Sequence, residues 1–367
     1  MFPSFASWSV LTADFLIVLY LMLGGAVFSA VLQVCGARWH YEFRRVALSL
    51  FALYPLALVL LSVLLAAPEI TFPWFNSEDY ASAWSAHTFQ FLGRSAEVRL
   101  PQWHNYAFLL AREFGGFMLV AFLFSRYVKL MLLSDETVDH WRRFRRISFW
   151  VPAIYVAYGT MVAWDFEMTL VPEWHSAIYG MYHFISNFGM FISFTMMLVY
   201  FFGKNGMMAK RVPEHVYNYI SQLLLAFSLL WIYMFFAQYL TIWYGNLPHE
   251  IDRVAEMEDG DFSTMWWATI ALKFAIPFAL LIFDYTRHTP GMIAAIACSI
   301  FAGTWIERYL WIAGSYPSGP YVPGHMPMTS LFDIAATLAV ILTGYLLVRG
   351  SLVRNRIIYV AGSPAAL

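Results

Sequence analysis

The sequence predicts an all-α integral membrane protein with about nine transmembrane helices. Of its 367 residues, 60% are hydrophobic and only 12% are charged, which is about half the charged share of a soluble domain. The charged residues are clustered, so long apolar runs lie between them. A run of about 20 apolar residues crosses the hydrocarbon core of a bilayer as a helix. A soluble enzyme is therefore excluded.

Each of the nine apolar segments is predicted to be one helix that spans the membrane. The first has no Lys or Arg before it and is about twice as long as the apolar part of a secretory signal, so we expect it to be retained. The segments cover approximately residues 9–34, 44–67, 103–133, 147–170, 176–203, 216–243, 263–284, 289–314 and 328–349.

The distribution of basic residues predicts the orientation. Fourteen Lys and Arg lie after the odd-numbered segments or in the C-terminal tail, and three lie in the opposite loops. Cytoplasmic loops carry an excess of Lys and Arg. The sequence therefore predicts an N-terminus outside the cytoplasm and a cytoplasmic C-terminus.

Two long loops are predicted on the outer side. Residues 68–102 are rich in aromatic side chains, and residues 244–262 are acidic. Both are consistent with solvated or membrane-interface loops, or with a docking surface for an extracytoplasmic partner. Because the chain contains no soluble domain, we expect any such partner to bind these loops.

Composition excludes several cofactors and partners. The net charge of −1 makes nucleic acid an unsuitable partner. Two cysteines, Cys35 and Cys298, are too few for an iron–sulfur cluster, and neither lies in a C-x-x-C-H motif for c-type haem. His183 is the single histidine in the middle of a predicted helix, so a haem with two histidine ligands is not expected. We predict no metal bound by this chain.

An internal repeat relates the first four segments to the next four. Arg112 and Arg126 in segment 3 are fourteen residues apart, as are Lys273 and Arg287 in segment 7. Repeats of four helices have the same direction across the membrane, which predicts a parallel repeat. We expect two side-by-side four-helix bundles, residues 1–170 and 171–315, followed by one extra helix and a cytoplasmic tail in residues 316–367.

Ionisable side chains inside the predicted helices are few. Such groups are costly in a bilayer, usually face the interior of a bundle, and are often functional. Judged by distance from the segment ends, they lie in the outer half of the membrane. They are Asp14, Arg112, Glu113, Asp165, His183, Lys273, Glu307, Arg308 and Asp333.

Acids and bases gathered near one membrane face are suited to quinol oxidation, because quinol releases two protons with its two electrons. Asp165 and Glu113 are candidate proton acceptors. His183 is a candidate bridge between them because imidazole titrates near neutral pH, although a hydrogen-bonded core histidine is the alternative.

The buried bases have two possible roles. Arg112, Lys273 and Arg308 could keep functional carboxylates ionised, or they could neutralise the acids as purely structural pairs. For the adjacent residues Glu307 and Arg308, the structural pairing is favoured.

Two stretches resemble the NrfD/polysulfide-reductase membrane-subunit family. They are residues 163–180 (AWDFEMTLVPEWHSAIYG) and residues 236–250 (FAQYLTIWYGNLPHE), with weaker similarity at 25–28, 37–39 and 273–278. The greatest similarity is to the smaller of the two quinone-type membrane subunits of bacterial alternative complex III. By motif, only Asp165 and the region of Trp174, His175 and Ser176 are assigned to the candidate site.

The resemblance implies a subunit of a respiratory quinol:cytochrome c oxidoreductase in a bacterial inner membrane. The implied partners are a homologous larger membrane subunit, a periplasmic iron–sulfur subunit and multihaem cytochromes c, which carry the clusters and haems. Menaquinol or ubiquinol is the implied substrate. Gly159 stands where we expect a histidine in the quinol-oxidising larger subunit, and one N-terminal helix is missing. A companion role, as scaffold and proton path, is therefore favoured over a quinol site on this chain.

Two other classes of function remain open. A secondary transporter is consistent with a parallel repeat that contains buried charges, although Pro277 is the one conspicuous break at mid-membrane. A purely structural anchor would leave the buried ionisable residues without a role other than pairing.

Overall fold

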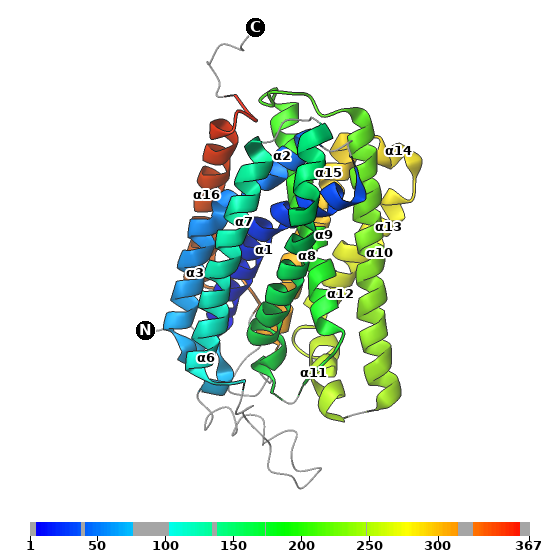
Figure 1. The fold of residues 1–367 in the computed structure, drawn as a ribbon. Helices are drawn as coiled ribbons and strands as arrows, with labels where there is room; N and C mark the ends of the chain where they lie inside the picture. The colour runs from blue at the N-terminus through cyan, green and yellow to red at the C-terminus, as the bar shows by residue number, and fades with distance from the viewer. Residues whose placement is uncertain are drawn as a thin grey trace.

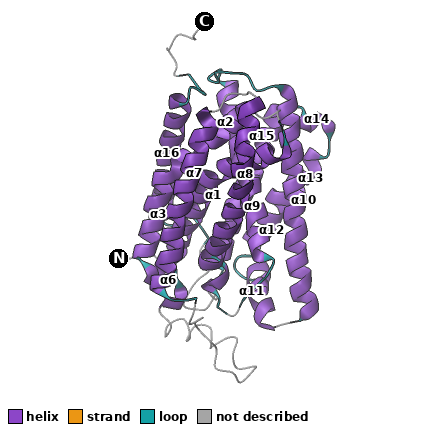
Figure 2. Ribbon diagram, viewed as in Figure 1, coloured by secondary structure: helices purple, strands orange, loops and turns teal. Residues whose placement is uncertain are grey.

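The chain is an all-α, multi-pass membrane protein. A computed structural model describes residues 5–37, 41–75, 103–133, 138–172, 174–246, 248–314 and 326–359. Within these ranges the regular elements are helices, without any strand (Figures 1 and 2). Nine helical segments in the described residues are long and apolar enough to cross a membrane. The prediction of nine spans is confirmed.

The spans begin and end close to the predicted limits, and several consist of more than one element. They are Ser7–Cys35, Tyr41–Ala66, Tyr106–Leu133, Phe144–Leu170, Tyr179–Lys204, Glu214–Gly245, Ser263–Leu281, Pro290–Ala313 and Leu331–Arg354. The first two spans contain α1 (Phe5–Cys35), α2 (Tyr41–Ser49), η1 (Leu50–Leu53) and α3 (Tyr54–Ala66). The next two contain α6 (Tyr106–Leu110), η4 (Ala111–Gly115), α7 (Gly116–Leu133), α8 (Val138–Phe166) and η5 (Met168–Leu170). The others contain α9 (Tyr179–Lys204), α10 (Glu214–Gly245), α12 (Ser263–Ile270), η6 (Ala271–Ala275), α13 (Ile276–Leu281), α15 (Pro290–Ala313) and α16 (Leu331–Arg354).

The first helix, α1, lies at the centre of the protein. Its apolar residues lie on all sides and Asp14 is its one charged residue, and a helix of this kind is normally buried. It packs against α3, α8, α9, α15 and α16 (Figure 1). Helix α9 also packs on both α8 and α15. The elements that meet at the centre therefore come from both predicted bundles, and the division at residues 170 and 315 stays a prediction.

Residues 244–262, expected to form an acidic outer loop, contain the helix α11 (Pro248–Asp259). Val254 and Met257 are buried, while Asp252 and Asp259 are exposed. The three-residue spacing of the buried pair places both on one helical face, which packs onto the end of the bundle. The other predicted outer loop, 68–102, contains α4 (Pro68–Thr71) and η2 (Pro73–Phe75); its residues 76–102 lie outside the described residues.

Segments 3 and 7 contain the same irregularity. Each is interrupted by a π-helical turn, η4 in segment 3 and η6 in segment 7. A π-turn within an α-helix is rare and often lies at a functional site. Each turn carries one buried base, Arg112 or Lys273. This correspondence is consistent with the predicted repeat, which pairs these two segments.

The close packing of α1 on α2 depends on a glycine. A Cβ atom at Gly25 would lie 2.1 Å from the backbone oxygen of Ala47. We expect Gly25→Ala to force the helices apart and to lower stability by about 1–3 kcal/mol, the usual cost of overpacking. Thermal unfolding in detergent measures this effect. The control is Gly350→Ala in α16, because a Cβ there meets no heavy atom of the described structure within 4 Å. Equal unfolding temperatures for the two variants would contradict the prediction.

Candidate functional site

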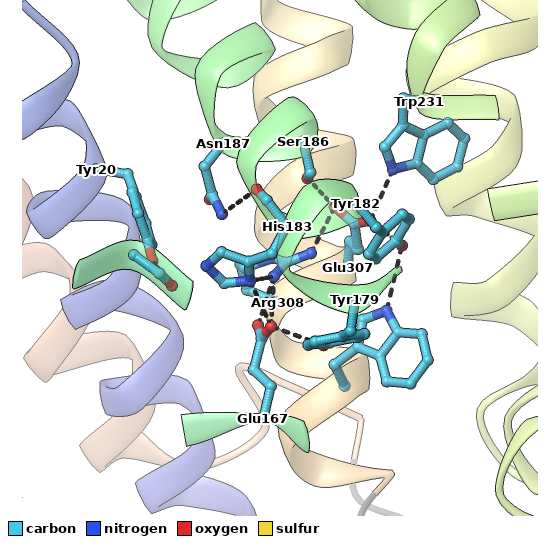
Figure 3. A network of polar contacts seen from close by, with 12 residues as sticks. Tyr20, Glu167, Tyr179, Tyr182, His183, Ser186, Asn187, Trp231, Glu307 and Arg308 are labelled. Atoms are coloured by element: carbon cyan, nitrogen blue, oxygen red, sulfur yellow. Dashed lines mark hydrogen bonds and ion pairs between the residues drawn. The ribbon is translucent and has the colours of Figure 1, made fainter. Parts of the chain in front are cut away.

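Four buried charged side chains form a continuous row, which we call the ionic chain: Glu167, Arg308, Glu307 and Lys273. Arg308 Nη1 lies 2.6 Å from Glu167 Oε2, and Arg308 Nη2 lies 3.0 Å from Glu307 Oε2 (Figure 3). Lys273 Nζ forms an ion pair with the same oxygen of Glu307. All four side chains are at least 98% buried. The chain joins the end of segment 4 to segments 7 and 8.

The backbone of three elements places these groups together. Glu167 lies in the short break between α8 and η5, whereas Glu307 and Arg308 are neighbours on α15. One turn before Glu307, Gly303 lets η6 approach α15 closely, since a Cβ at Gly303 would lie 2.7 Å from Lys273 Cγ. The glycine and the π-turn together bring Lys273 to Glu307.

The Glu307 carboxylate accepts hydrogen bonds from three other side chains. Tyr182 and Ser186 of α9 donate their hydroxyls to it, and Trp231 Nε1 of α10 donates over 2.8 Å (Figure 3). Lys273 is a fourth donor, so these groups occupy the acceptor positions that a carboxylate offers, and Arg308 adds an ion pair. Glu307 is thus held as a fully paired anion.

His183 of α9 lies between Glu167 and Arg308. Its Nδ1 atom is 2.7 Å from Glu167 Oε2 and 2.5 Å from Arg308 Nη1. An imidazole nitrogen can donate to the carboxylate or accept from the guanidinium, but it cannot do both, so the contact depends on where the proton resides. Its Nε2 atom is buried and has no hydrogen-bond partner among the described residues. The contacts through which His183 can exchange a proton are therefore at Nδ1.

Arg253 of α11 positions the backbone of Glu167. Its guanidinium donates to the carbonyl oxygens of Glu167 at 2.9 Å, Met168 at 3.2 Å and Trp311 at 3.0 Å. It also lies over the rings of Trp174 and Trp311, 4.7 and 5.0 Å from their centroids. Although sequence analysis placed it in an outer loop, Arg253 is buried and secures the break that carries Glu167.

A second ion pair lies in the first half of the chain. Arg112 Nε is 2.6 Å from Asp165 Oδ2, and Arg112 Nη2 is 2.6 Å from Asp165 Oδ1. Trp103 Nε1 donates to Asp165 Oδ1 over 2.7 Å, and Arg112 donates to the Trp103 carbonyl oxygen over 2.9 Å. Two parallel bonds between a guanidinium and a carboxylate are a strong and geometrically specific arrangement.

Glu113 lies next to this pair and is fully buried. It is within electrostatic range of Asp165 and Arg112. Neither of its carboxyl oxygens has a hydrogen-bond donor among the described residues. A buried carboxyl group in this position is an unsatisfied polar group, and such groups are costly unless they have a role or a water molecule.

Tyr20 of α1 contacts the histidine of the first charged group. Its ring contacts His183 edge-on, with centroids 4.9 Å apart, and its hydroxyl donates to the Gly159 carbonyl oxygen over 3.1 Å (Figure 3). The structure thus places Tyr20 beside His183, with its hydroxyl bonded to the backbone of α8.

Two small cavities lie near the ionic chain: Lys273 lines one of them, and the other is lined by two tyrosines that donate hydrogen bonds to Glu167 and Glu307. One, of about 20 Å³, is lined by Tyr179, Tyr182 and Gln238, and the other, of about 10 Å³, by Ser186, Trp231 and Lys273. A cavity needs roughly 10–15 Å³ to hold one water molecule. These spaces are of the size of water, whereas organic ligands occupy pockets of about 300–1,000 Å³.

The candidate residues from the sequence fall into four places. Lys273, Glu307, Arg308 and His183 come together, and Arg112, Glu113 and Asp165 form the second group. Asp14 is separate: it accepts hydrogen bonds from Trp305 at 2.7 Å and Thr337 at 2.6 Å, and so joins α1 to α15 and α16. Asp333 caps the first turn of α16 through Ser330.

The three residues of the motif region, Trp174, His175 and Ser176, also have different environments. Trp174 is buried, His175 is exposed, and Ser176 donates a hydrogen bond to Gln238 of α10. Ser176 therefore links the two stretches that carry the family resemblance.

Sequence analysis missed Glu167 and Tyr20. Glu167 follows Asp165 by two residues and lies in the same resembling stretch, so this spacing could have marked it. Tyr20 carries no such signal, because a tyrosine in an apolar helix is ordinary. In the described part of the chain, no three His, Cys, Asp or Glu side chains are grouped as metal ligands.

Fold and site together define a multi-pass α-helical membrane protein with a buried row of alternating acids and bases. No known family model matches the sequence, and no curated protein matches it significantly.

Proposed function

We propose that this chain is an integral membrane subunit of a respiratory quinol:cytochrome c oxidoreductase, in which it serves as a scaffold and a proton path. The ionic chain is the observation that carries the proposal. Isolated structural pairs would neutralise buried charges two at a time, but here two acids and two bases form one row. His183 extends the row, and the ring of Tyr20 packs against His183.

The chemistry of the row supports proton transfer. Transfer needs donors and acceptors in hydrogen-bond contact and water at the ends. Glu167 and His183, which can both exchange protons, are 2.7 Å apart, while Arg308 stays protonated beside them. One cavity of water size is lined by Lys273 and Ser186, and another by Tyr182, which donates to Glu307. Ionisable groups that face a bundle interior often form such relays in membrane proteins.

The same cavities argue against a quinol site in the ionic chain. Volumes of about 20 and 10 Å³ are far below the several hundred Å³ that a ring-sized ligand requires. The resemblance leads us to expect a histidine in the larger sister subunit at the position of Gly159. In this chain, a Cβ atom added at Gly159 would lie 3.5 Å from the ring of Tyr20. We therefore propose that the homologous larger subunit oxidises quinol, and we assign no quinol step to this chain.

The proposal includes a location and partners. The chain lies in a bacterial inner membrane, with the end that carries α11 towards the periplasm and the end of α16 towards the cytoplasm. The resemblance supports a periplasmic iron–sulfur subunit and multihaem cytochromes c as neighbours on the α11 side. The exposed carboxylates Asp252 and Asp259 would lie on that docking face.

Co-purification tests the proposed assembly. We expect a tagged chain, extracted in mild detergent, to carry c-type haem and iron in amounts that match one complex. The chain itself has too few cysteines for either group. A colourless protein that purifies alone would overturn the oxidoreductase proposal and would favour a secondary transporter.

Lys273→Met tests the proton path. The variant keeps the length of the side chain and leaves Glu307 paired with Arg308, so we expect the complex to assemble. We expect proton-coupled quinol turnover to fall by about tenfold or more, since positioned proton donors and acceptors commonly contribute at least that much. The measurement is proton release per electron in liposomes that contain the complex.

Lys129→Met is the matched control, because Lys129 is exposed on α7. It should leave both turnover and proton release unchanged. Normal proton release in an assembled Lys273→Met complex would show that the ionic chain has a structural role alone.

A further inference from the structure

A large apolar pocket lies between α1, α9, α15 and α16, apart from the ionic chain. Its volume is about 750 Å³, within the range of ligand pockets. Its walls include Val18 of α1, Phe194 of α9, Ala295 of α15 and Ile341 of α16. Helix α1 packs against all three of the other helices, and the pocket lies between α9 and α16.

The pocket is somewhat longer than the hydrocarbon half of one bilayer leaflet. It extends along α15 from Trp305 to Gly291 and along α16 from Thr337 to Arg349. At about 1.5 Å per residue, these stretches are roughly 21 and 18 Å long. Half of the hydrocarbon core is about 15 Å thick. An acyl chain in one leaflet, with its ester linkage, therefore matches the pocket.

The two ends of the pocket differ in charge. Asp14, hydrogen-bonded to Trp305 and Thr337, closes the end that lies deeper in the membrane. At the opposite end the pocket wall contains Arg349, which is half-buried and has no recorded hydrogen bond or ion pair with another described residue. The carboxylate repels a phosphate group, and the guanidinium attracts one.

A second cation lies at the same end. Lys204, at the end of α9, has its Nζ atom 5.8 Å from the ring centroid of Tyr200, which lines the pocket. Basic pockets between transmembrane helices on the cytoplasmic side bind the headgroups of anionic lipids. A quinone has no negative charge and would leave Arg349 without a partner.

We infer that this pocket binds an anionic phospholipid of the leaflet at the Arg349 end. Its acyl chain fills the space between α9, α15 and α16, and its phosphate binds Arg349 and Lys204. Because α16 packs chiefly on α1 and the second span, the lipid would also connect α16 to the second half of the protein.

The lipid content of purified protein tests this inference. Wild-type protein, exchanged into fresh detergent, should retain about one anionic phospholipid per chain in native mass spectrometry. We expect Arg349→Gln to retain at least about tenfold less, because a charge-assisted hydrogen bond to phosphate is lost. Arg354→Gln is the matched control, as Arg354 is exposed one turn further along α16 and should retain the lipid.

Two further measurements keep the test independent of that one variant. Ala295→Phe fills the pocket and leaves every charge in place, so it should also lose the lipid. Delipidated wild type should be stabilised against heat by phosphatidylglycerol and not by phosphatidylcholine. Equal retention by wild type and Arg349→Gln, a retained quinone or zwitterionic lipid in place of the anionic one, or no bound lipid in the wild type would overturn the inference.

Discussion

Arg308→Gln is expected to reduce stability by about 3–5 kcal/mol, the typical result of removing one partner from a buried ion pair. Arg308 is completely buried and contacts two carboxylates, Glu167 and Glu307. Glu307 would keep Lys273, but Glu167 would keep only Tyr179 and His183 as hydrogen-bond partners. The expected result is a strongly reduced yield of folded protein and a lower unfolding temperature in detergent.

A double variant separates the loss of the pair from the loss of packing. Adding Glu167→Gln to Arg308→Gln removes the unpaired carboxylate and should recover part of the lost stability. Arg354→Gln, at the exposed end of α16, serves as the control and should unfold like the wild type. If Arg308→Gln and Arg354→Gln unfold at the same temperature, the ionic chain does not stabilise the fold.

Asp165→Asn has the second-largest expected effect, again about 3–5 kcal/mol. The substitution leaves the buried guanidinium of Arg112 without its two hydrogen bonds of 2.6 Å to a carboxylate. We expect a lower unfolding temperature and a smaller yield of assembled protein. Asp259→Asn, on the exposed face of α11, should have no such effect.

The double variant Arg112→Met with Asp165→Asn distinguishes pairing from proton transfer. Replacing a buried ion pair by uncharged residues is often neutral for stability. If Asp165 acts only as a structural partner, the double variant should recover stability and retain proton-coupled turnover. If Asp165 also accepts protons, the double variant should be stable but its proton-coupled turnover should be slow. A double variant no more stable than Asp165→Asn would contradict the assignment of Arg112 as its partner.

The sequence was sufficient to predict the nine spans. In a bilayer each helix must satisfy its own backbone hydrogen bonds, so a span can be recognised from the length of its apolar run. The candidate residues could be found for a related reason. A charge within such a run is so costly that the sequence alone indicates Arg112, Lys273 and Glu307 as candidate residues, without their partners.

Amphipathic and irregular elements were harder to predict. The segment that contains α11 is acidic and resembles a loop in composition, yet its buried Val254 and Met257 form a narrow apolar face. In the π-turns at Arg112 and Lys273, one inserted residue changes the direction in which the side chains point. No residue type in the sequence indicates such a turn.

The choice of partners was decided by the tertiary structure. Asp165 and Glu167 are two residues apart, but Asp165 binds Arg112 of segment 3 while Glu167, in the break after α8, binds Arg308 of α15. Hydropathy and spacing determine that a segment spans the membrane and carries a charge at a certain depth. They do not determine how each helix is rotated or which helices are neighbours. Those features arise from side-chain packing around α1, which places Tyr20 beside His183 and leaves the apolar pocket beneath α16.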